Sequence, residues 1–555
     1  MIATGDWQPV TDMVRLTDIP FSRIPHQSQL FLSYLEASPA ALRFYQSAPS
    51  VEGIADARAR IGNMPFPRRE IASILRRQNE KFGSGALTLK RIGELERPDC
   101  VAILTGQQVG LFTGPLYTVY KALTAVRMAD DLNQQGISAV PVFWMDTEDH
   151  DLPEVTRRAL LYPDSSLRSI DYREALFDEM PAFSVGSIPF PDKILLAVQH
   201  YLAHLPDGAA KADIATHLES ACRPGVTFAE SFGELLARLL PDWGLILFDP
   251  RDPDAKRLVS SVFQKALSEE AVFRNALLRR NHELESSGFH AQVNVLGNST
   301  VLFYLDQGER RAIERRGSGF GLKNTDHTFG LDELRQEAGR TPEKFSPNVL
   351  LRPVVQDHLF PTIAYVGGSS ELAYFAQAGV LYELYGRPMP VAWPRNSFTL
   401  LEPEVAAEMD RLRIEFPDCF QGRHLLAEWA TRHSRSRAAS EIDELGGHID
   451  RVLMGVRPEL EAVEATLADA LETARRKIQH NVQRLRSRAI RFEVTGDSAI
   501  STAVDFVLNN CYPNQNLQER ELGIYHFLAR RGVSVLDDLR SVMNPGHFVH
   551  GVIRL

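Results

Sequence analysis

Five ionisable side chains within six positions follow an apolar run at 139–145. They are Asp146, Glu148, Asp149, His150 and Asp151. A histidine between carboxylates has its charged form favoured and its ring oriented, which is what a general base needs. We therefore expect His150 to act as a base that Asp149 or Asp151 orients. The alternatives are an acidic turn with a solvated histidine, or a site for Mg²⁺ or a transition metal. No second histidine stands at ligand spacing, so we predict no metal.

A glycine-rich loop precedes this stretch, between an apolar run at 100–104 and a helix that we expect to begin at Pro115. The loop matches neither the Walker A pattern nor the G-x-G-x-x-G of dinucleotide folds. Backbone N–H groups at such a loop and helix N-terminus suit a phosphate or a carboxylate. The predicted substrate- or anion-binding residues here are Thr105, Gly106, Gln107, Gln108, Gly110, Thr113, Gly114 and Tyr117. The alternative is a tight turn in which glycine only provides clearance.

Polar residues also follow apolar runs at 348–355, 362–366 and 389–393, each of which we predict to be a strand. The substrate-binding candidates that follow these runs are Asp357, His358, Ser369, Ser370, Arg395 and Asn396. Arg395 and His358 would hold carboxylates, and arginine can do so in a bidentate manner. Helix capping explains Ser369 and Ser370 adequately, which makes a nucleophilic serine the weaker hypothesis. A surface position is the alternative for Arg395.

Apolar runs typical of buried strands alternate with helical segments from about residue 96 to 400. This alternation predicts an α/β core with a mostly parallel sheet and insertions. Right-handed crossovers bring the carboxyl ends of neighbouring parallel strands to one edge, where open sheets bind their ligands. The polar strand ends therefore predict one shared crevice.

The chain divides into four predicted regions. Residues 1–95 form a mainly helical segment that joins the core, and residues 96–403 form the core with an inserted subdomain at about 155–240. Residues 404–492 form a helical coiled-coil domain. Residues 493–555 pack back on the core, and their end could form a strand at the sheet edge.

The coiled-coil region has the pattern of a long helical hairpin. Apolar residues recur at spacings of three and four through 460–489, nearer an eleven-residue than a seven-residue repeat. A similar series begins with Leu426, Trp429 and His433, and Gly455 with Pro458 separates the two as a helix stop and start. We expect an antiparallel hairpin that projects from the body and makes a homodimer contact. A lid or a docking surface for another partner is the alternative.

Composition excludes several classes of protein. A chain of 555 residues is too long for one core. Its net charge of -10 argues against a sequence-blind nucleic-acid binder. Neither a signal peptide nor an apolar run of membrane-spanning length is present, so we expect a cytoplasmic protein without membrane contact. The four cysteines are scattered, which fits a reducing compartment and argues against a disulfide framework or a structural zinc site.

Four long motifs follow one another along the chain. They read TGQQVGLFTGPLYTVYKA (105–122), PVFWMDTEDHDLPEV (141–155), LLRPVVQDHLFPTIAYVGGSSELAYFAQ (350–377) and MPVAWPRNSFTLLE (389–402). Together with the coiled-coil segment they resemble the BshC family, the cysteine ligases of bacillithiol biosynthesis, over essentially the whole chain. The resemblance implies a Rossmann-like core with inserted connecting subdomains and a coiled coil that mediates dimerisation. It also implies a reaction that joins the carboxyl group of L-cysteine to the amino group of glucosaminyl-malate, and it assigns no catalytic residue.

Amide formation from a free carboxylate is uphill in water, so the carboxyl group must be activated. ATP is the obvious activator, through an adenylate or an acyl phosphate, although the sequence has no Walker motif and no HIGH or KMSKS signature. We therefore treat a nucleotide as a possible further substrate beside cysteine and glucosaminyl-malate. The competing hypotheses are an enzyme that transfers a nucleotidyl or glycosyl group to another amino sugar, and a coiled-coil scaffold with a vestigial pocket.

Overall fold

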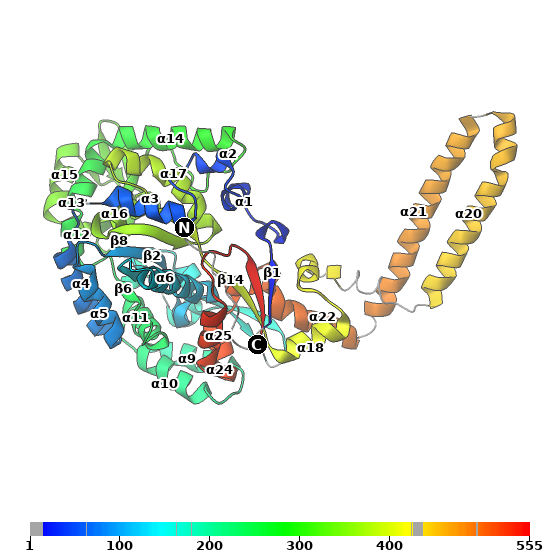
Figure 1. The fold of residues 1–555 in the computed structure, drawn as a ribbon, viewed down its shortest axis with the longest axis horizontal. Coiled ribbons are helices and arrows are strands. Elements are labelled where there is room, and N and C mark those ends of the chain that lie inside the picture. Colours follow the sequence, from blue (N-terminus) through cyan, green and yellow to red (C-terminus); the bar gives the residue numbers. More distant parts are fainter. Residues whose placement is uncertain are drawn as a thin grey trace.

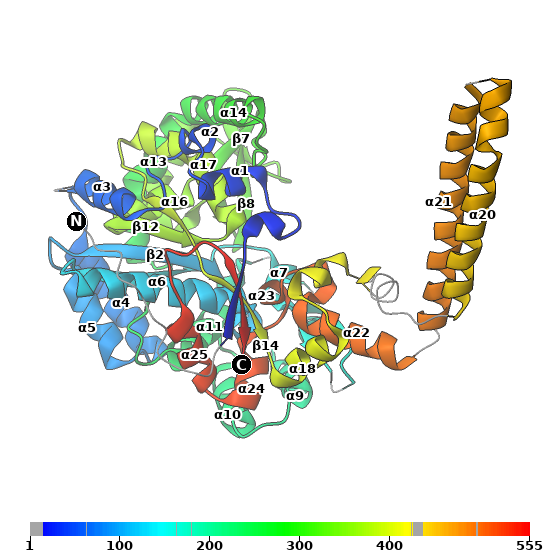
Figure 2. The same ribbon diagram turned by 45° about the vertical axis from the view of Figure 1, so that its right-hand side comes forward.

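The computed structural model of this chain describes residues 15–62, 64–162, 164–178, 180–181, 183–422, 424–425, 437–464, 466–495 and 498–555. Figures 1 and 2 show a body of sheets and helices, from which a hairpin of two long helices projects.

A five-stranded parallel sheet forms the centre of the body. In spatial order its strands are β13 (Val391–Pro394), β12 (Thr362–Gly367), β2 (Val101–Gln108), β3 (Ala139–Asp146) and β6 (Ile246–Phe248). Every neighbouring pair is parallel. The chain begins at the central β2, moves outward through β3 and β6, and then crosses to β12 and β13 on the other side. This order confirms the predicted α/β, Rossmann-like core and places its switch point between β2 and β12.

Helices cover both faces of the parallel sheet, which explains why its strands are apolar throughout. Val101 and Ile103 of β2 pack in one core with α3 (Val51–Ile61) and α6 (Leu116–Gln134). Ala102 and Leu104 belong to the opposite core, with α17 (Ser369–Tyr385). Successive side chains of a strand point to opposite faces, so one short run supplies both cores.

A second sheet lies between β6 and β12 in the sequence, and it is antiparallel. In spatial order its strands are β10 (Thr328–Phe329), β9 (Gly319–Leu322), β8 (Glu309–Arg316), β7 (Ser299–Asp306) and β11 (Phe345–Pro347). The apolar run at 301–305, which is typical of a buried strand, lies in β7 and therefore outside the parallel sheet. The apolar run at 293–296 forms no strand.

The region 155–240 lies between β3 and β6 and carries a small hairpin and several helices. The hairpin pairs β4 (Arg157–Leu161) with β5 (Leu167–Asp171). The longer helices are α9 (Ile194–His204), α10 (Lys211–Ala221) and α11 (Phe228–Leu239).

The C-terminal residues do form a strand, β15 (His550–Arg554). This strand does not extend the parallel sheet. It lies between β1 (Arg15–Ile19) and β14 (Ser397–Leu401) in a separate three-stranded sheet. The two ends of the described chain thus meet beside the segment that follows β13.

The prediction of a strand at 348–355 is wrong. Arg352–Leu359 forms helix α16, with Pro353 in its first turn. The Asn348 side chain accepts hydrogen bonds from the backbone N–H groups of Leu350 and Leu351 (3.1 and 3.0 Å), which turns the chain before the helix. A short apolar run does not distinguish a buried strand from a buried helix by its periodicity.

The projecting element is an antiparallel helical hairpin, as predicted. Helix α20 spans Arg437–Val463 and α21 spans Thr466–Thr495. Arg475 and Arg486 of α21 reach Asp450 and Asp443 of α20 (2.6 and 2.8 Å), and this pairing fixes the antiparallel register.

The predicted turn of the hairpin at Gly455 and Pro458 is wrong, because α20 continues through both residues to Val463. A proline removes only one helical hydrogen bond, and the rest of the hairpin stays paired around it. The predicted contacts of Leu426, Trp429 and His433 lie outside the described residues.

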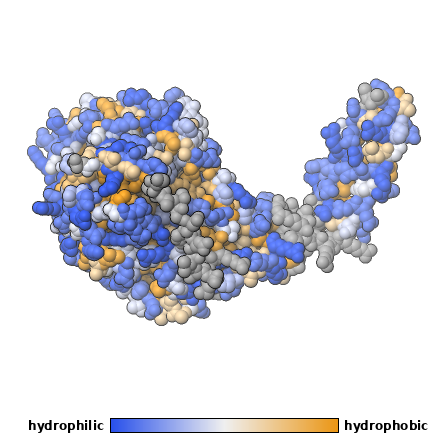
Figure 3. Space-filling view, viewed as in Figure 1, coloured by the Kyte–Doolittle hydropathy of each residue, from blue (hydrophilic) through white to orange (hydrophobic). Residues whose placement is uncertain are grey.

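The hairpin surface is mostly hydrophilic in Figure 3, with apolar side chains between the charged ones. Leu445, Val452 and Leu485 each leave half or more of their side-chain surface exposed. No helix in the described part of the chain is both long and apolar enough to cross a membrane.

Candidate active site

A pocket of about 400 Å³ opens at the carboxyl ends of β2, β3 and β12, beside the switch point of the parallel sheet. Ligands of open α/β sheets bind at this position. Side chains reach the pocket from the sheet, from α6 and α17, from the antiparallel sheet and from α23 (Gln518–Glu521). The polar residues around it are Gln107, Gln108, Tyr117, Lys121, Asp146, Glu148, Asp149, Glu154, Arg310, Asn348, Arg352, Tyr365, Ser369, Ser370, Glu371, Tyr374, Arg395 and Arg520.

The floor of the pocket is a buried ion pair between Lys121 of α6 and Glu371 of α17. Lys121 Nζ lies 2.5 Å from Glu371 Oε2, and it donates to Gln107 Oε1 (2.7 Å) and to the Gly106 carbonyl (2.9 Å). Burial lowers the pKa of Lys121, but three acceptors around Nζ hold it as an ammonium. This ammonium, the Gly368 N–H and the Tyr365 hydroxyl keep the pKa of Glu371 under its usual value despite burial.

Glu371 also fixes the chain that leads into α17. Its Oε2 accepts from the Gly368 N–H (2.8 Å) and its Oε1 accepts from the Tyr365 hydroxyl (2.8 Å). Gly368 is therefore the N-cap of α17, and the expectation that Ser369 or Ser370 caps this helix is wrong. Both serines line the pocket, and neither hydroxyl has a hydrogen-bond partner among the described residues.

Asp146 ends β3 and faces the pocket. Burial raises its pKa to about 6, and the charge of Asp149 adds to the shift, whereas Arg352 and Arg310 oppose it. Its carboxylate has no hydrogen-bond donor in the described chain. A carboxyl group with this pKa exchanges protons close to neutral pH, as a general base does.

Asp149 and His150 meet as predicted from their spacing. Asp149 Oδ1 lies 3.4 Å from His150 Nδ1, and Asp149 Oδ2 accepts from Gln108 Nε2 (2.5 Å). Arg310 approaches the same carboxylate at 3.7 Å, and the pKa of Asp149 falls well below its usual range. The His150 side chain is 58% exposed and lines a neighbouring, more apolar pocket of about 350 Å³. Asp151 lies apart from this pair, because its side chain caps α7 (Leu152–Thr156) through the Glu154 N–H.

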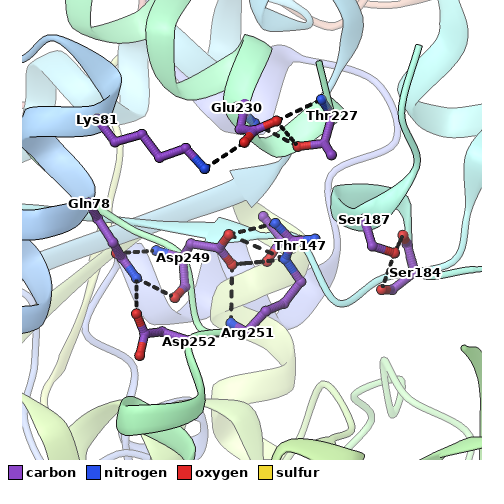
Figure 4. A network of polar contacts seen from close by, with 10 residues as sticks. All are labelled: Gln78, Lys81, Thr147, Ser184, Ser187, Thr227, Glu230, Asp249, Arg251 and Asp252. Carbon is purple, nitrogen blue, oxygen red and sulfur yellow. Dashed lines mark hydrogen bonds and ion pairs between the residues drawn. The ribbon is translucent and has the colours of Figure 1, made fainter. Parts of the chain in front are cut away.

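A polar network at the end of β6 holds Thr147, in the loop that follows β3 (Figure 4). Asp249, at the end of β6, accepts from the Thr147 hydroxyl (2.6 Å) and from the Arg251 guanidinium (2.7 Å). Arg251 and Thr147 keep the pKa of this buried carboxyl low. The polar residues at the end of β6 therefore hold the neighbouring loop and do not line the pocket.

Only some residues of the glycine loop line the pocket. Gly106, Gln107, Gln108 and Tyr117 line the pocket, whereas Thr105, Gly110, Thr113 and Gly114 do not. The Arg158 guanidinium fills the space beside Gly110, where a Cβ atom would lie 2.3 Å from Nη2.

The N-terminus of α6 already has a partner inside the chain, because the Leu116 N–H donates to the Leu522 carbonyl (2.8 Å). We expected an anion to bind the backbone N–H groups at this helix end. At least one of them, the Leu116 N–H, is thus engaged by the protein itself.

The candidates after 348–355 do not reach the pocket, because α16 directs them elsewhere. Asp357 accepts from the Tyr382 hydroxyl and from Gln356 Nε2, and burial raises its pKa to about 6. His358 Nδ1 lies 2.7 Å from the Val354 carbonyl, and burial lowers its pKa to about 4. Asn396 is also directed away from the pocket, with Nδ2 donating to the Asn544 carbonyl (2.8 Å).

Two arginines with different partners stand near the N-terminus of α17. Arg395 makes a bidentate ion pair with Glu519 of α23 (2.6 and 2.9 Å). Arg520, the next residue of α23, has no ion pair with any described residue and lines the pocket. Among the described residues, no group of three or more His, Cys, Asp or Glu side chains is arranged to hold a metal ion.

Comparison with known proteins agrees with this architecture. Residues 15–396 match the N-terminal Rossmann-like domain of the bacillithiol biosynthesis protein BshC. Residues 398–555 match the C-terminal coiled-coil domain of the same protein.

The chain belongs to the BshC family.

Relatives named "Putative cysteine ligase BshC" align over nearly their full length. The BshC of Koribacter versatilis is 38% identical over 526 residues, which cover 94% of this chain and 96% of the relative. The BshC of Salinibacter ruber is 32% identical over 531 residues, with the same two coverages of 94% and 96%. The BshC of Solibacter usitatus is 34% identical over 517 residues, covering 93% and 95%.

The pocket contains functional candidates that sequence reasoning missed. Lys121 follows Tyr117 by one helical turn, so the spacing of four could have placed both on one face. Arg352 precedes Asp357 and His358 in the same segment, but it is not among the predicted substrate-binding residues. Arg310 and Arg520 come from an antiparallel sheet and a C-terminal helix, and no local pattern links them to the strand ends.

The buried pair of Lys121 and Glu371 at the floor of the pocket predicts an asymmetric response to mutation. Glu371→Gln leaves the Lys121 ammonium buried without its counter-charge, so we expect a loss of ~3–5 kcal/mol in the free energy of unfolding. Adding Lys121→Met to Glu371→Gln should restore much of that loss, because no uncompensated charge remains. Chemical denaturation measures both changes.

The matched control is the exposed pair of Arg457 and Glu461 on the hairpin. Glu461→Gln should leave the free energy of unfolding nearly unchanged, because water screens this pair. Equal losses at Glu371 and Glu461 would contradict the role of the buried pair.

Proposed function

We propose that this protein is a ligase that joins the carboxyl group of L-cysteine to the amino group of glucosaminyl-malate. Membership of the BshC family and the names of the relatives support this reaction. The observation that carries the proposal to this chain is the pocket itself. It combines cations suited to carboxylates with a carboxyl group, Asp146, that titrates near neutral pH.

The malate carboxylates would bind near the N-terminus of α17. Ser369 and Ser370 offer hydroxyl groups without described partners, and the helix dipole favours an anion there. Arg520 supplies a full positive charge in the pocket lining, and Arg395 adds the N–H groups that Glu519 does not use. Of the predicted substrate-binding residues, Gln107, Gln108 and Tyr117 form the facing wall.

The amino group of the substrate must lose a proton before it attacks an activated carboxyl group. Asp146 is our first candidate for the base, because it lies in the pocket and its pKa is raised to about 6. His150, oriented by Asp149, is the second candidate, and it would act from the neighbouring pocket. Carboxyl activation by ATP remains part of the proposal. The phosphate groups of ATP would bind to the arginines of the pocket, because the N-terminus of α6 already has a partner in the Leu522 carbonyl.

The reaction is tested with purified protein, L-cysteine, glucosaminyl-malate and ATP, with the product identified by mass spectrometry. We expect the amide product to form and to require ATP. Omitting ATP is the control, and an unreactive wild-type protein under all these conditions would remove the proposal.

The pH dependence of kcat/KM in two single variants distinguishes the candidate bases. If Asp146 is the base, kcat/KM falls as pH drops below about 6, since the protonated carboxyl cannot accept a proton. Asp146→Asn should then lower kcat by ~10²-fold or more and abolish that acidic limb. His150→Ala should lower turnover at least ~10-fold if the histidine acts as the base. An unchanged acidic limb in Asp146→Asn together with its loss in His150→Ala would transfer the role to His150.

We also propose that the protein is a cytoplasmic homodimer that associates through the hairpin. The exposed apolar residues Leu445, Val452 and Leu485 support this surface. Replacing all three with Ser should give a monomer with an intact pocket, because burying apolar side chains drives association. Light scattering after gel filtration measures the mass.

The control for the hairpin variant replaces Leu196, Val272 and Val533, which are comparably exposed apolar residues of the body. This control should remain dimeric. A scaffold without enzyme activity would instead show no ligase activity in either form, and a hairpin variant that stays dimeric would exclude this interface.

A further inference from the structure

A buried histidine outside the pocket occupies an ordered chain of hydrogen bonds. His550 of β15 is fully buried. Its Nδ1 lies 2.7 Å from the Ser397 hydroxyl and its Nε2 lies 2.9 Å from the Thr399 hydroxyl. Ser397 Oγ in turn lies 2.9 Å from Glu519 Oε1. The chain of contacts therefore ends on the carboxylate that pairs with Arg395.

The direction of each hydrogen bond follows from the number of protons. A carboxylate only accepts, so the single hydroxyl proton of Ser397 goes to Glu519. Ser397 Oγ must then accept from His550 Nδ1–H. Burial and the nearby charge of Arg395 disfavour a second ring proton, and the pKa of His550 falls to about 4, although Glu519 opposes this shift. His550 is thus neutral, protonated on Nδ1, and its Nε2 accepts from Thr399.

Glu519 receives four hydrogen bonds in this arrangement. Two come from Arg395, one from Ser397 and one from the Phe398 N–H (3.2 Å). Both oxygens are therefore engaged, and the carboxylate has one orientation. Its pKa stays below the usual value because Arg395 offsets the effect of burial.

Arg395 keeps two N–H groups for the pocket. Its Nη1 donates to Glu519 and to the Asn396 carbonyl, and one proton of Nη2 goes to Glu519. The Nε–H and the second proton of Nη2 have no acceptor among the residues that the structure describes. A Cβ atom on Gly368 would lie 3.7 Å from Nε, so this edge of the guanidinium faces the beginning of α17.

We propose that His550, Ser397, Thr399 and Glu519 are positioning residues that aim Arg395 at a substrate carboxylate beside Ser369. This inference rests on the proposed function for its substrate, whereas the direction of the hydrogen bonds does not. The positioning residues come from two segments, β14 and the C-terminal region. The docked C-terminus therefore determines how the pocket receives an anion.

The first test separates substrate binding from turnover. Glu519→Gln keeps the shape of the side chain but places an amide where a carboxylate held Arg395. We expect KM for glucosaminyl-malate to rise at least ~10-fold by loss of one charge-assisted hydrogen bond, with KM for cysteine and kcat changed less than ~3-fold. Asp410→Asn is the matched control, since Asp410 forms a bidentate pair with Arg554 of β15 on the surface. It should leave both KM values unchanged.

The second test examines the assigned ring proton. Asn at position 550 can place an N–H group near that of Nδ1, whereas Gln reaches toward Nε2. His550→Asn should therefore keep KM for glucosaminyl-malate within about 3-fold of the wild type, and His550→Gln should raise it about as much as Glu519→Gln does. Equal KM values for the two variants, or a KM for cysteine that rises in parallel, would overturn the positioning role.

A third measurement does not depend on ligase activity. The ring faces the charged groups Glu519 and Arg395, and its pKa in the folded protein, about 4, lies below the unfolded value of about 6.5. The unfolded state binds the extra proton, so the contribution of His550 to stability is present above about pH 6.5 and lost as pH falls toward 4. Between pH 7 and 5 the Tm of the wild type should fall further than that of His550→Asn.

Equal falls in Tm would contradict the neutral ring whether or not the protein is a ligase. If the wild type forms no amide, isothermal titration of glucosaminyl-malate replaces KM in the comparison of Glu519→Gln with Asp410→Asn. Equal affinities in that titration would also overturn the positioning role.

Discussion

The buried ion pair between Lys121 and Glu371 joins the two halves of the parallel sheet at the point where its strand order reverses. Lys121 belongs to the helix after β2 and Glu371 to the helix after β12. Neither charge is tolerable in this interior without the other, so the two helix N-termini are held in one relative position. The same pair orients Gln107, Gly368 and Tyr365, and through them most of the pocket floor.

Around this pair, the protein uses its own chain to close positions that other Rossmann-like folds leave to a ligand. The Leu522 carbonyl engages the N-terminus of α6, and the Arg158 guanidinium fills the glycine loop. At the N-terminus of α17, two serine hydroxyls have no hydrogen-bond partner within the described part of the chain, and two arginines lie nearby. The proposed anion site therefore lies at the N-terminus of α17, after the fourth strand of the core, and not at the first crossover helix. The C-terminal segment, which supplies Glu519 and Arg520, becomes part of the pocket wall.

Much of the fold was predictable because its signals are local. The βαβ unit of β2, α6 and β3 follows from continuous apolar runs, a glycine loop and helical periodicity, and the hairpin follows from a long apolar seam. The errors were local ambiguities. The apolar run at 348–355 is compatible with a strand or with a buried helix, and it forms part of a helix. Pro458 is compatible with a turn or with a helix that lacks one hydrogen bond, and it lies inside a helix. Of the antiparallel sheet, only the apolar run at 301–305 indicates a strand from the sequence, since pairing partners leave no periodic signal.

The sequence by itself determined which residue types stand at the ends of β2 and β3, and it thereby located the pocket and brought Asp149 to His150. Only the tertiary structure decided which of these side chains face the pocket and which charges surround them. Arg310 comes to Asp146, and Arg520 to Ser369, from segments more than a hundred residues away along the chain. The physical reason is that burial, desolvation and the pairing of charges depend on contacts between distant segments. Local spacing carries no record of those contacts.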